Sequence, residues 1–243
     1  MKNFTALFFL AIPWFLAAQT LTTTPPLPSY RQALNLLQEG SRSLDKTSLS
    51  NALEVFRNSP AHKEDGFSCD YRAAQACLGL TRAYDLEKHR DLAEKILDVG
   101  IQCAQRAVSQ APGSADTHAL LGRLYEVKLS YGDMFTGMDI GPKAGTENKK
   151  ALALNPRDPQ VQLALGIQYV MAPLIGGGDV SKGILALKEA LRLDPKMDEV
   201  YYWLAKAYRK QNKRLNFEEV LQTGMKLNPK NPLFEKEWDN WKP

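Results

Sequence analysis

Apolar residues recur every three or four positions from Ser29 onward, and short polar breaks interrupt them. This spacing places the apolar residues on one face of a helix, and no segment shows the alternation that predicts a β-strand. Four breaks contain a proline, which ends a helix because it lacks a backbone N–H and disfavours helical geometry in the residue before it. The pattern predicts an all-α fold. The prolines are Pro112, Pro156, Pro195 and Pro229.

The spacing of these prolines indicates a repeat. Pro195 and Pro229 lie 34 residues apart, whereas the two preceding intervals are 39 and 44 residues long. A 34-residue unit is the length of a helix–turn–helix repeat. The longer intervals predict insertions of five and ten residues, near 172–180 and 131–144.

The repeat units share residue types at matching positions. The first helix of each has a large residue, then Leu, a small residue and Tyr. Leu and Tyr fill the space between paired helices, and small residues let two helices approach closely. Each hairpin leaves an apolar face that only the next hairpin covers, which predicts a solenoid. The matching sets are Cys77, Leu80, Thr81 and Tyr84; His118, Leu121, Gly122 and Tyr125; Gln162, Leu165, Gly166 and Tyr169; and Tyr201, Leu204, Ala205 and Tyr208.

On these residues, the segment from about 69 to 231 resembles exported bacterial tetratricopeptide (TPR) repeat proteins. The inserted stretches 131–144 and 172–180 are also similar to those of such proteins. A weaker similarity, of architecture only, is to the periplasmic TPR components of TRAP-type solute transporters. The resemblance implies an α-solenoid with a concave groove that binds peptides or protein segments.

We expect about five helical hairpins over 29–243, followed by a C-terminal helix. In that helix Phe234, Trp238 and Trp241 fall on one face. Such a face can cap the last hairpin, as terminal repeats require. Contact of the tryptophans with a partner is the alternative.

The first eighteen residues differ from the rest of the chain. Lys2 precedes an apolar stretch over 4–16, and small residues then lead to Ala18. This order is typical of a secretory signal peptide, here with cleavage after Ala18. An uncleaved anchor is the alternative, but the stretch is shorter than the roughly 20 residues that span a bilayer and contains Pro13. We therefore expect a periplasmic or secreted protein with an extended linker over 19–28 and no transmembrane segment after signal removal.

The charge and the reactive side chains exclude several functions. The chain has 31 basic and 27 acidic residues without a run of like charge, so we expect no nucleic-acid partner. The three histidines show no metal spacing, and no base lies beside a cysteine in sequence, so we expect no catalytic site, metal or cofactor. The Gly176–Asp179 run lacks the Gly-Lys-Ser/Thr of a phosphate loop, and Asp179 or Ser181 is expected to cap a helix instead.

The concave groove is the candidate binding site that the resemblance implies. An apolar floor beside a cationic wall suits a protein or peptide segment with an acidic group or a free carboxylate. A small ligand of a solute transporter is the second hypothesis. It stays open whether these residues bind a partner or are core and solvated surface. The candidate groove residues are Arg123, Leu163, Ile167, Met171, Tyr202, Lys206, Arg209 and Lys210.

The two insertions are expected to emerge as loops along one edge of the solenoid. Long loops in compact repeats are often functional, and packing of their apolar residues on one another is the alternative. The candidate residues on this edge are Phe135, Met138, Ile140, Leu174 and Ile175.

Cys77 and Cys103 lie at equal distances from the break near Arg90, in helices expected to run antiparallel. They are therefore expected to face each other. A disulfide requires Cα atoms within about 7 Å, so a bridge and two buried free thiols both remain open.

Overall fold

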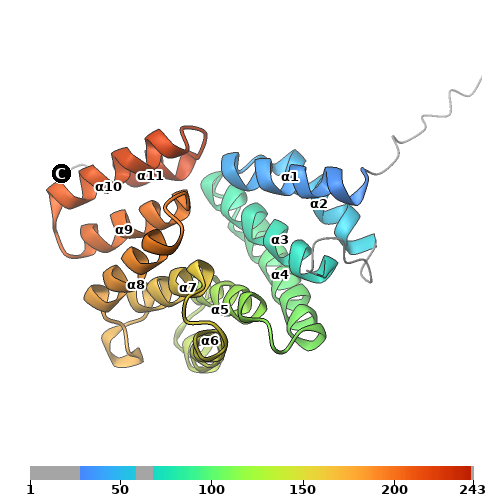
Figure 1. The fold of residues 1–243 in the computed structure, drawn as a ribbon, viewed down its shortest axis with the longest axis horizontal. Coiled ribbons are helices and arrows are strands. Elements are labelled where there is room, and N and C mark those ends of the chain that lie inside the picture. The colour runs from blue at the N-terminus through green and yellow to red at the C-terminus, as the bar shows by residue number, and fades with distance from the viewer. Residues whose placement is uncertain (1–27, 59–67, 242–243) are drawn as a thin grey trace, which may run out of the picture.

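The computed structural model describes residues 28–58 and 68–241, which form eleven α-helices and one short 3₁₀ helix without a strand among them (Figure 1). The predicted all-α solenoid is thereby confirmed. The predicted signal peptide and nearly all of the 19–28 linker lie outside these residues. The helices are α1 (Tyr30–Ser43), α2 (Lys46–Asn58), α3 (Cys69–Leu86), α4 (Arg90–Gln110), α5 (Ala115–Leu129), α6 (Met134–Leu154), α7 (Pro159–Met171), η1 (Leu174–Gly176), α8 (Val180–Leu193), α9 (Asp198–Lys210), α10 (Arg214–Leu227) and α11 (Pro232–Asp239).

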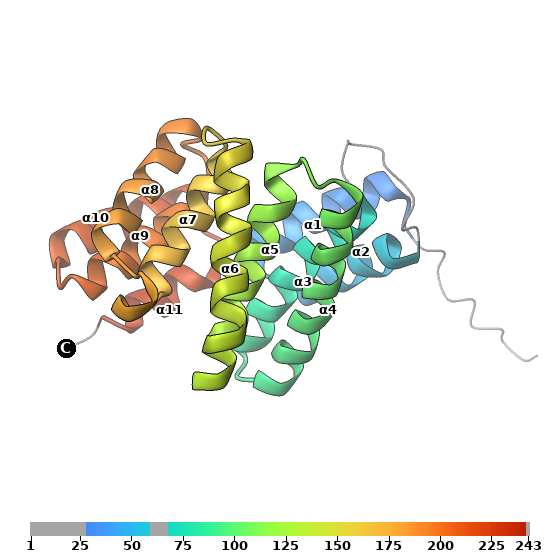
Figure 2. The same cartoon turned by 90° about the horizontal axis from the view of Figure 1, so that it is seen from below.

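Consecutive helices pair into five antiparallel hairpins, and each hairpin packs against the next (Figure 2). The small residues of the repeat lie where helices meet. A Cβ atom at Gly166 in α7 would lie 2.6 Å from Leu187 Cγ and 3.3 Å from the carbonyl oxygen of Gly183 in α8. The two backbones therefore approach as closely as they do because Gly166 has no side chain.

We expect Gly166→Ala to lower the free energy of unfolding by about 1–3 kcal/mol, the usual cost of an overpacked contact. Gly137→Ala is the matched control, because nothing lies within 4 Å of a Cβ at Gly137. Alanine is the better helix former, so this control should be more stable by about 0.5–1 kcal/mol. Urea unfolding measures both. Equal effects would contradict the close approach of α7 and α8.

The predicted loop over 131–144 is wrong, because this stretch is helical from Met134. The side chain of Asp133 caps α6 by accepting a hydrogen bond of 3.0 Å from the backbone N–H of Thr136. The insertion therefore lengthens α6 to 21 residues, against 15 for α5. The second insertion is a turn containing η1, and Asp179 caps α8 as predicted, accepting from the N–H groups of Ser181 and Lys182 at 3.0 Å.

The solenoid closes on itself, so that the last helix meets the first hairpin (Figure 1). Asn228, just after α10, donates a hydrogen bond of 2.9 Å from Nδ2 to the carbonyl oxygen of Arg42 in α1. Leu44, Ala83 and Leu233 form a small apolar cluster between α1, α3 and α11. The concave face is therefore the inside of a closed ring.

Helix α11 caps the last hairpin, as expected. Phe234 is buried, and Trp241 and Trp238 stack on Phe217 of α10 with ring centroids 4.7 and 6.3 Å apart. The tryptophans therefore cover the exposed end of the apolar core.

Cys77 and Cys103 are buried and form no disulfide in this structure, and Cys69 is buried as well. Of the two alternatives for Cys77 and Cys103, a disulfide or two buried free thiols, the structure shows two buried free thiols. Within the described part of the chain, no helix combines the length and the apolar composition that crossing a bilayer requires.

Candidate functional site

The inside of the ring is lined by equivalent positions of four first helices, α3, α5, α7 and α9. The shared spacing within each helix places residues two and nine positions before the repeat tyrosine on the same inward face. The position nine residues before it holds Gln75, Asp116, Gln160 and Glu199. The position two residues before it holds Arg82, Arg123, Ile167 and Lys206.

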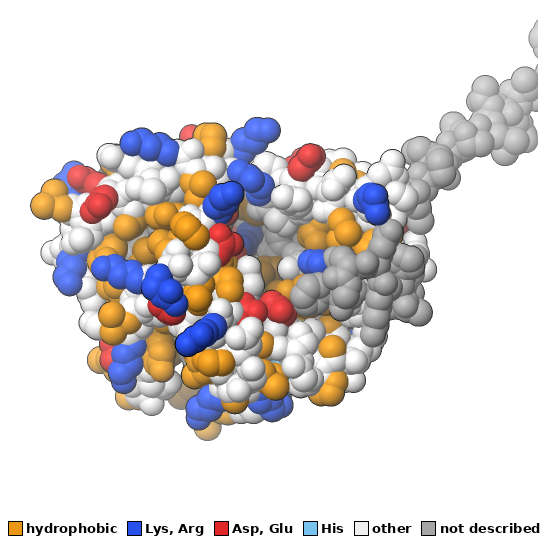
Figure 3. All heavy atoms as spheres, in the orientation of Figure 1, with side chains coloured by type: hydrophobic (Ala, Val, Ile, Leu, Met, Phe, Trp, Pro, Cys, Tyr) orange, Lys and Arg blue, Asp and Glu red, His pale blue; other side chains and the backbone are white. Residues whose placement is uncertain are grey.

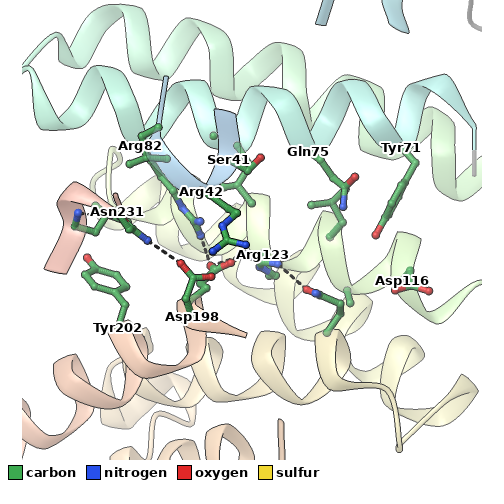
Figure 4. A pocket seen from close by; sticks show the side chains of 18 residues that line it. Ser41, Arg42, Tyr71, Gln75, Arg82, Asp116, Arg123, Asp198, Tyr202 and Asn231 are labelled. Carbon is green, nitrogen blue, oxygen red and sulfur yellow. Dashed lines mark hydrogen bonds and ion pairs between the residues drawn. The ribbon is translucent and has the colours of Figure 1, made fainter. Parts of the chain in front are cut away.

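A largely buried ion-pair cluster, the plug, lies at the middle of the ring and consists of Arg82, Arg123 and Glu199. Arg123 Nη2 donates to Glu199 Oε1 and Oε2 at 2.6 and 2.7 Å, and Arg82 donates to the same carboxylate (Figure 4). Burial by itself raises the pKa of Glu199, but the two arginine charges outweigh it and hold the pKa at about 2. The plug thus joins α3, α5 and α9 across the ring.

A front cavity of about 190 Å³ lies at the N-terminal ends of the first helices. On this face the space-filling view shows a hollow with acidic and basic side chains at its border (Figure 3). Asp198 Oδ2 at its edge accepts hydrogen bonds of 2.5 Å from Asn228 and 3.3 Å from Asn231. Burial and the nearby charge of Asp158 raise the pKa of Asp116. Polar and apolar side chains both line the front cavity, and its polar residues include Tyr71, Gln75, Asp116, Gln160 and Asp198.

A rear cavity of about 350 Å³ lies beyond the plug, toward the C-terminal ends of the first helices. The two cavities share Arg82, Tyr202 and Leu233 at their boundary. The rear cavity combines apolar and charged walls, which is typical of binding sites. Its residues include Glu126, Val127, Ile167, Met171, Trp203, Lys206, Arg209 and Lys236.

Lys206 is the basic group on the α9 side of the rear cavity. Its Nζ lies 4.5 Å from the ring centroid of Trp203 and 5.3 Å from that of Tyr202, in cation–π contact with both. Burial lowers its pKa to about 8. No ion pair of Lys206 with another described residue accompanies these contacts, so its charge is available to an anionic ligand.

Glu126 is the acidic group on the α5 side. Glu126 is only 3% exposed, and Oε2 of its carboxyl group has no hydrogen-bond partner in the described structure. Burial raises its pKa to about 7. Buried carboxylates are normally paired, so this one is an unusual feature of the cavity wall.

Two other basic side chains of the rear cavity, Arg209 and Lys236, differ in whether they are free to bind a ligand. Arg209 Nε donates to the buried Glu237 at 2.6 Å, which fixes α11 against α9. Lys236, in contrast, is exposed on α11 at the cavity border.

The fold has counterparts among solved structures. The TPR protein TTC0263 of Thermus thermophilus matches with a TM-score of 0.59 and 19% sequence identity, over 86% of this chain and 97% of that one. The fold is that of a TPR solenoid. A chain in the Cut9–Hcn1 hetero-tetramer of the APC/C matches with a TM-score of 0.50 and 20% identity, over 82% of this chain and 34% of that one. Neither a protein-family model nor a curated protein sequence matches significantly.

The eight predicted groove residues do not all lie at one site in this TPR solenoid. Met171, Ile167, Tyr202, Lys206 and Arg209 line the rear cavity. The other three predicted residues do not. Arg123 belongs to the plug, Leu163 is fully buried core, and Lys210 donates from Nζ to the carbonyl oxygen of Val170 at 2.5 Å. The ring closes around the concave face, so the residues that line it border cavities inside the ring.

Three site residues were not predicted from the sequence, namely Arg82, Glu199 and Lys236. The repeat itself holds a signal for Arg82 and Glu199, which occupy the same two positions as Arg123 and Gln160. Lys236 lies outside the repeat, and its place depends on how α11 docks.

The predicted loop edge is partly present. Phe135, Met138, Leu174 and Ile175 are all exposed, the last two in the η1 turn. Ile140 is only partly buried and packs against the core. The N-terminal end of α6 and the η1 turn lie at the same end of the hairpins (Figure 2). Residues 28–58 and 68–241 hold no cluster of three or more His, Cys, Asp or Glu suited to a metal ion.

Proposed function

We propose that this chain is an exported, non-catalytic interaction scaffold that binds a protein or peptide segment at the rear cavity. The apolar side chains of Ile167 and Met171 and the basic groups of Lys206 and Lys236 line the same cavity there. An apolar segment with an acidic group or a free carboxylate complements this combination. The N-terminal signal-like sequence supports export, and the nearly balanced charge favours a protein partner over nucleic acid.

A partner capture tests this proposal. The protein is purified from the cell envelope, where its intact mass also shows whether residues 1–18 have been removed. It then retains binding proteins from an envelope extract, and quantitative mass spectrometry compares wild type with Lys236→Glu. We expect a partner to be lost at least about tenfold on charge reversal, since like charges across an interface cost several kcal/mol.

Lys226→Glu is the matched control, because Lys226 is also exposed but lies on α10, away from the residues that line the cavity. This variant should retain the partner as wild type does. Equal retention by all three proteins would contradict binding at the rear cavity.

A small-ligand-binding accessory of a solute transporter is the second candidate. Ring closure favours it, because a cavity of about 350 Å³ has the size of a small-molecule site. Native mass spectrometry distinguishes the two. A co-purifying small molecule, together with no captured protein, would favour this candidate.

A further inference from the structure

We propose that Glu126 binds a cationic group, an ammonium or a guanidinium, on the segment that enters the rear cavity. This inference rests on the proposed function and deepens it, because it gives the segment a basic group in addition to its acidic one.

The first support is the state of the Glu126 carboxyl group. It lines the cavity, its residue is 3% exposed, and Oε2 has no partner among the described residues. Burial is the cause of its raised pKa, without a contribution from a neighbouring positive charge. A buried carboxylate in this state gains a charge-assisted hydrogen bond when a cation arrives.

The second support is the order in which anionic, apolar and cationic side chains follow one another around the cavity. The cavity is also lined by Asp85 and Glu237, which accept hydrogen bonds from Tyr131 and Arg209. The carboxyl group with an unpartnered oxygen, Glu126, lies on α5, the apolar side chains of Ile167 and Met171 lie on α7, and the cationic Lys206 lies on α9. Helix α7 packs between α5 and α9 in the stack. A complementary ligand therefore has a cationic group, an apolar middle and an anionic group in the same order.

A peptide end with a basic residue followed by an apolar C-terminal residue has this order. A small zwitterion with an alkyl spacer has it as well. The two sources share one chemistry, and both can be offered to the intact protein.

Calorimetric titration with defined probes tests the inference. The probes are acetyl-Gly-Lys-Leu with a free carboxylate, the same peptide with norleucine in place of lysine, the lysine peptide with a C-terminal amide, and 6-aminohexanoate. We expect wild type to bind the lysine peptide at least about tenfold more tightly than the norleucine peptide, as for one hydrogen bond to a charged group. Binding of 6-aminohexanoate at similar strength would identify the small zwitterion as the better source.

The Glu126→Gln variant tests whether Glu126 causes the preference for the lysine peptide over the norleucine peptide. In this variant the preference for lysine over norleucine should fall to within about twofold. Glu219→Gln, on the exposed face of α10, should keep the wild-type preference. The amide should bind more weakly than the free carboxylate in wild type and in Glu126→Gln, and this difference should vanish in Lys206→Met.

Three results would overturn the inference. If wild type and Glu126→Gln show the same preference for lysine, Glu126 is not the group that binds it. If the free carboxylate is needed but lysine is not, the Glu126 inference fails while the proposed function stands. If no probe binds wild type at millimolar concentration, the inference also fails, and partner capture decides the proposed function separately.

Discussion

Replacing Glu199 with glutamine should lower the free energy of unfolding by about 3–5 kcal/mol, the cost of breaking a buried ion pair. The Glu199 carboxylate accepts from Arg82 and Arg123, whose side chains are 21% and 8% exposed. Glutamine removes the negative charge and leaves two guanidinium groups in the middle of the ring without the carboxylate that pairs with both of them. Urea unfolding followed by circular dichroism at neutral pH measures the loss.

The control is Glu189→Gln, which breaks an exposed pair with Arg192 on α8. Such pairs contribute about 0–1 kcal/mol, so this variant should unfold almost as wild type does. A loss below about 1 kcal/mol in Glu199→Gln would mean that the plug does not hold α3, α5 and α9 together.

The stability difference between wild type and Glu199→Gln should depend on pH, because the pKa of Glu199 is lowered in the folded protein. Its pKa is about 2 in the folded protein and 4.5 as an ordinary value. The carboxylate therefore stabilises the fold fully above pH 4.5, and this contribution is lost as the pH falls toward 2. The stability difference between wild type and Glu199→Gln should shrink over that interval.

Replacing Glu126 with glutamine should have the opposite effect and stabilise the protein at alkaline pH. The pKa of Glu126 rises from 4.5 to about 7 on folding. The folded state therefore favours the protonated carboxyl group, and wild type loses stability as the pH rises from 4.5 through 7. A pKa difference of this size between the unfolded and folded states corresponds to about 3 kcal/mol in the free energy of unfolding.

We therefore expect wild type and Glu126→Gln to differ little near pH 4.5, and the variant to be more stable by up to about 3 kcal/mol at pH 8. Unfolding by urea at several pH values measures the difference. Glu219→Gln should reproduce the wild-type profile, since Glu219 is exposed. An unchanged difference between pH 5 and pH 8 would contradict the buried, unpaired state of Glu126.

The sequence was sufficient to predict the hairpins and much of the inner face. Prolines end the helices, and the repeat spacing aligns their first helices. Positions such as Arg123 and Lys206 therefore fall on one side of the stack. Applying the same alignment to Arg82 and Glu199 predicts that they also face inward, because one repeat position shares one environment.

Ring closure had no local signal in the sequence. It depends on the angles at which successive hairpins pack, and small rotations add up along a solenoid. The hydrogen bond that joins the ends links Asn228 to Arg42, 186 residues away. The sequence therefore predicted a concave binding face but not its division into two cavities.

The helical start of α6 was missed for a different reason. Its first turns contain Gly137, Gly141 and Pro142, which disfavour a helix locally. The later part of α6 packs against α5 through buried residues that include Ala144 and Ala151, and Asp133 caps its start. Tertiary packing outweighed the local preference.

Methionine-methyl NMR of the protein with added acetyl-Gly-Lys-Leu tests binding at the rear cavity most directly. Met171 lines this cavity, whereas Met134 and Met138 are exposed on α6 and Met225 lies on α10. Binding at the rear cavity predicts that the Met171 methyl resonance shifts on titration while those of Met134, Met138 and Met225 stay in place. Shifts of Met134 and Met138 with an unchanged Met171 would place binding at the loop edge and contradict the account.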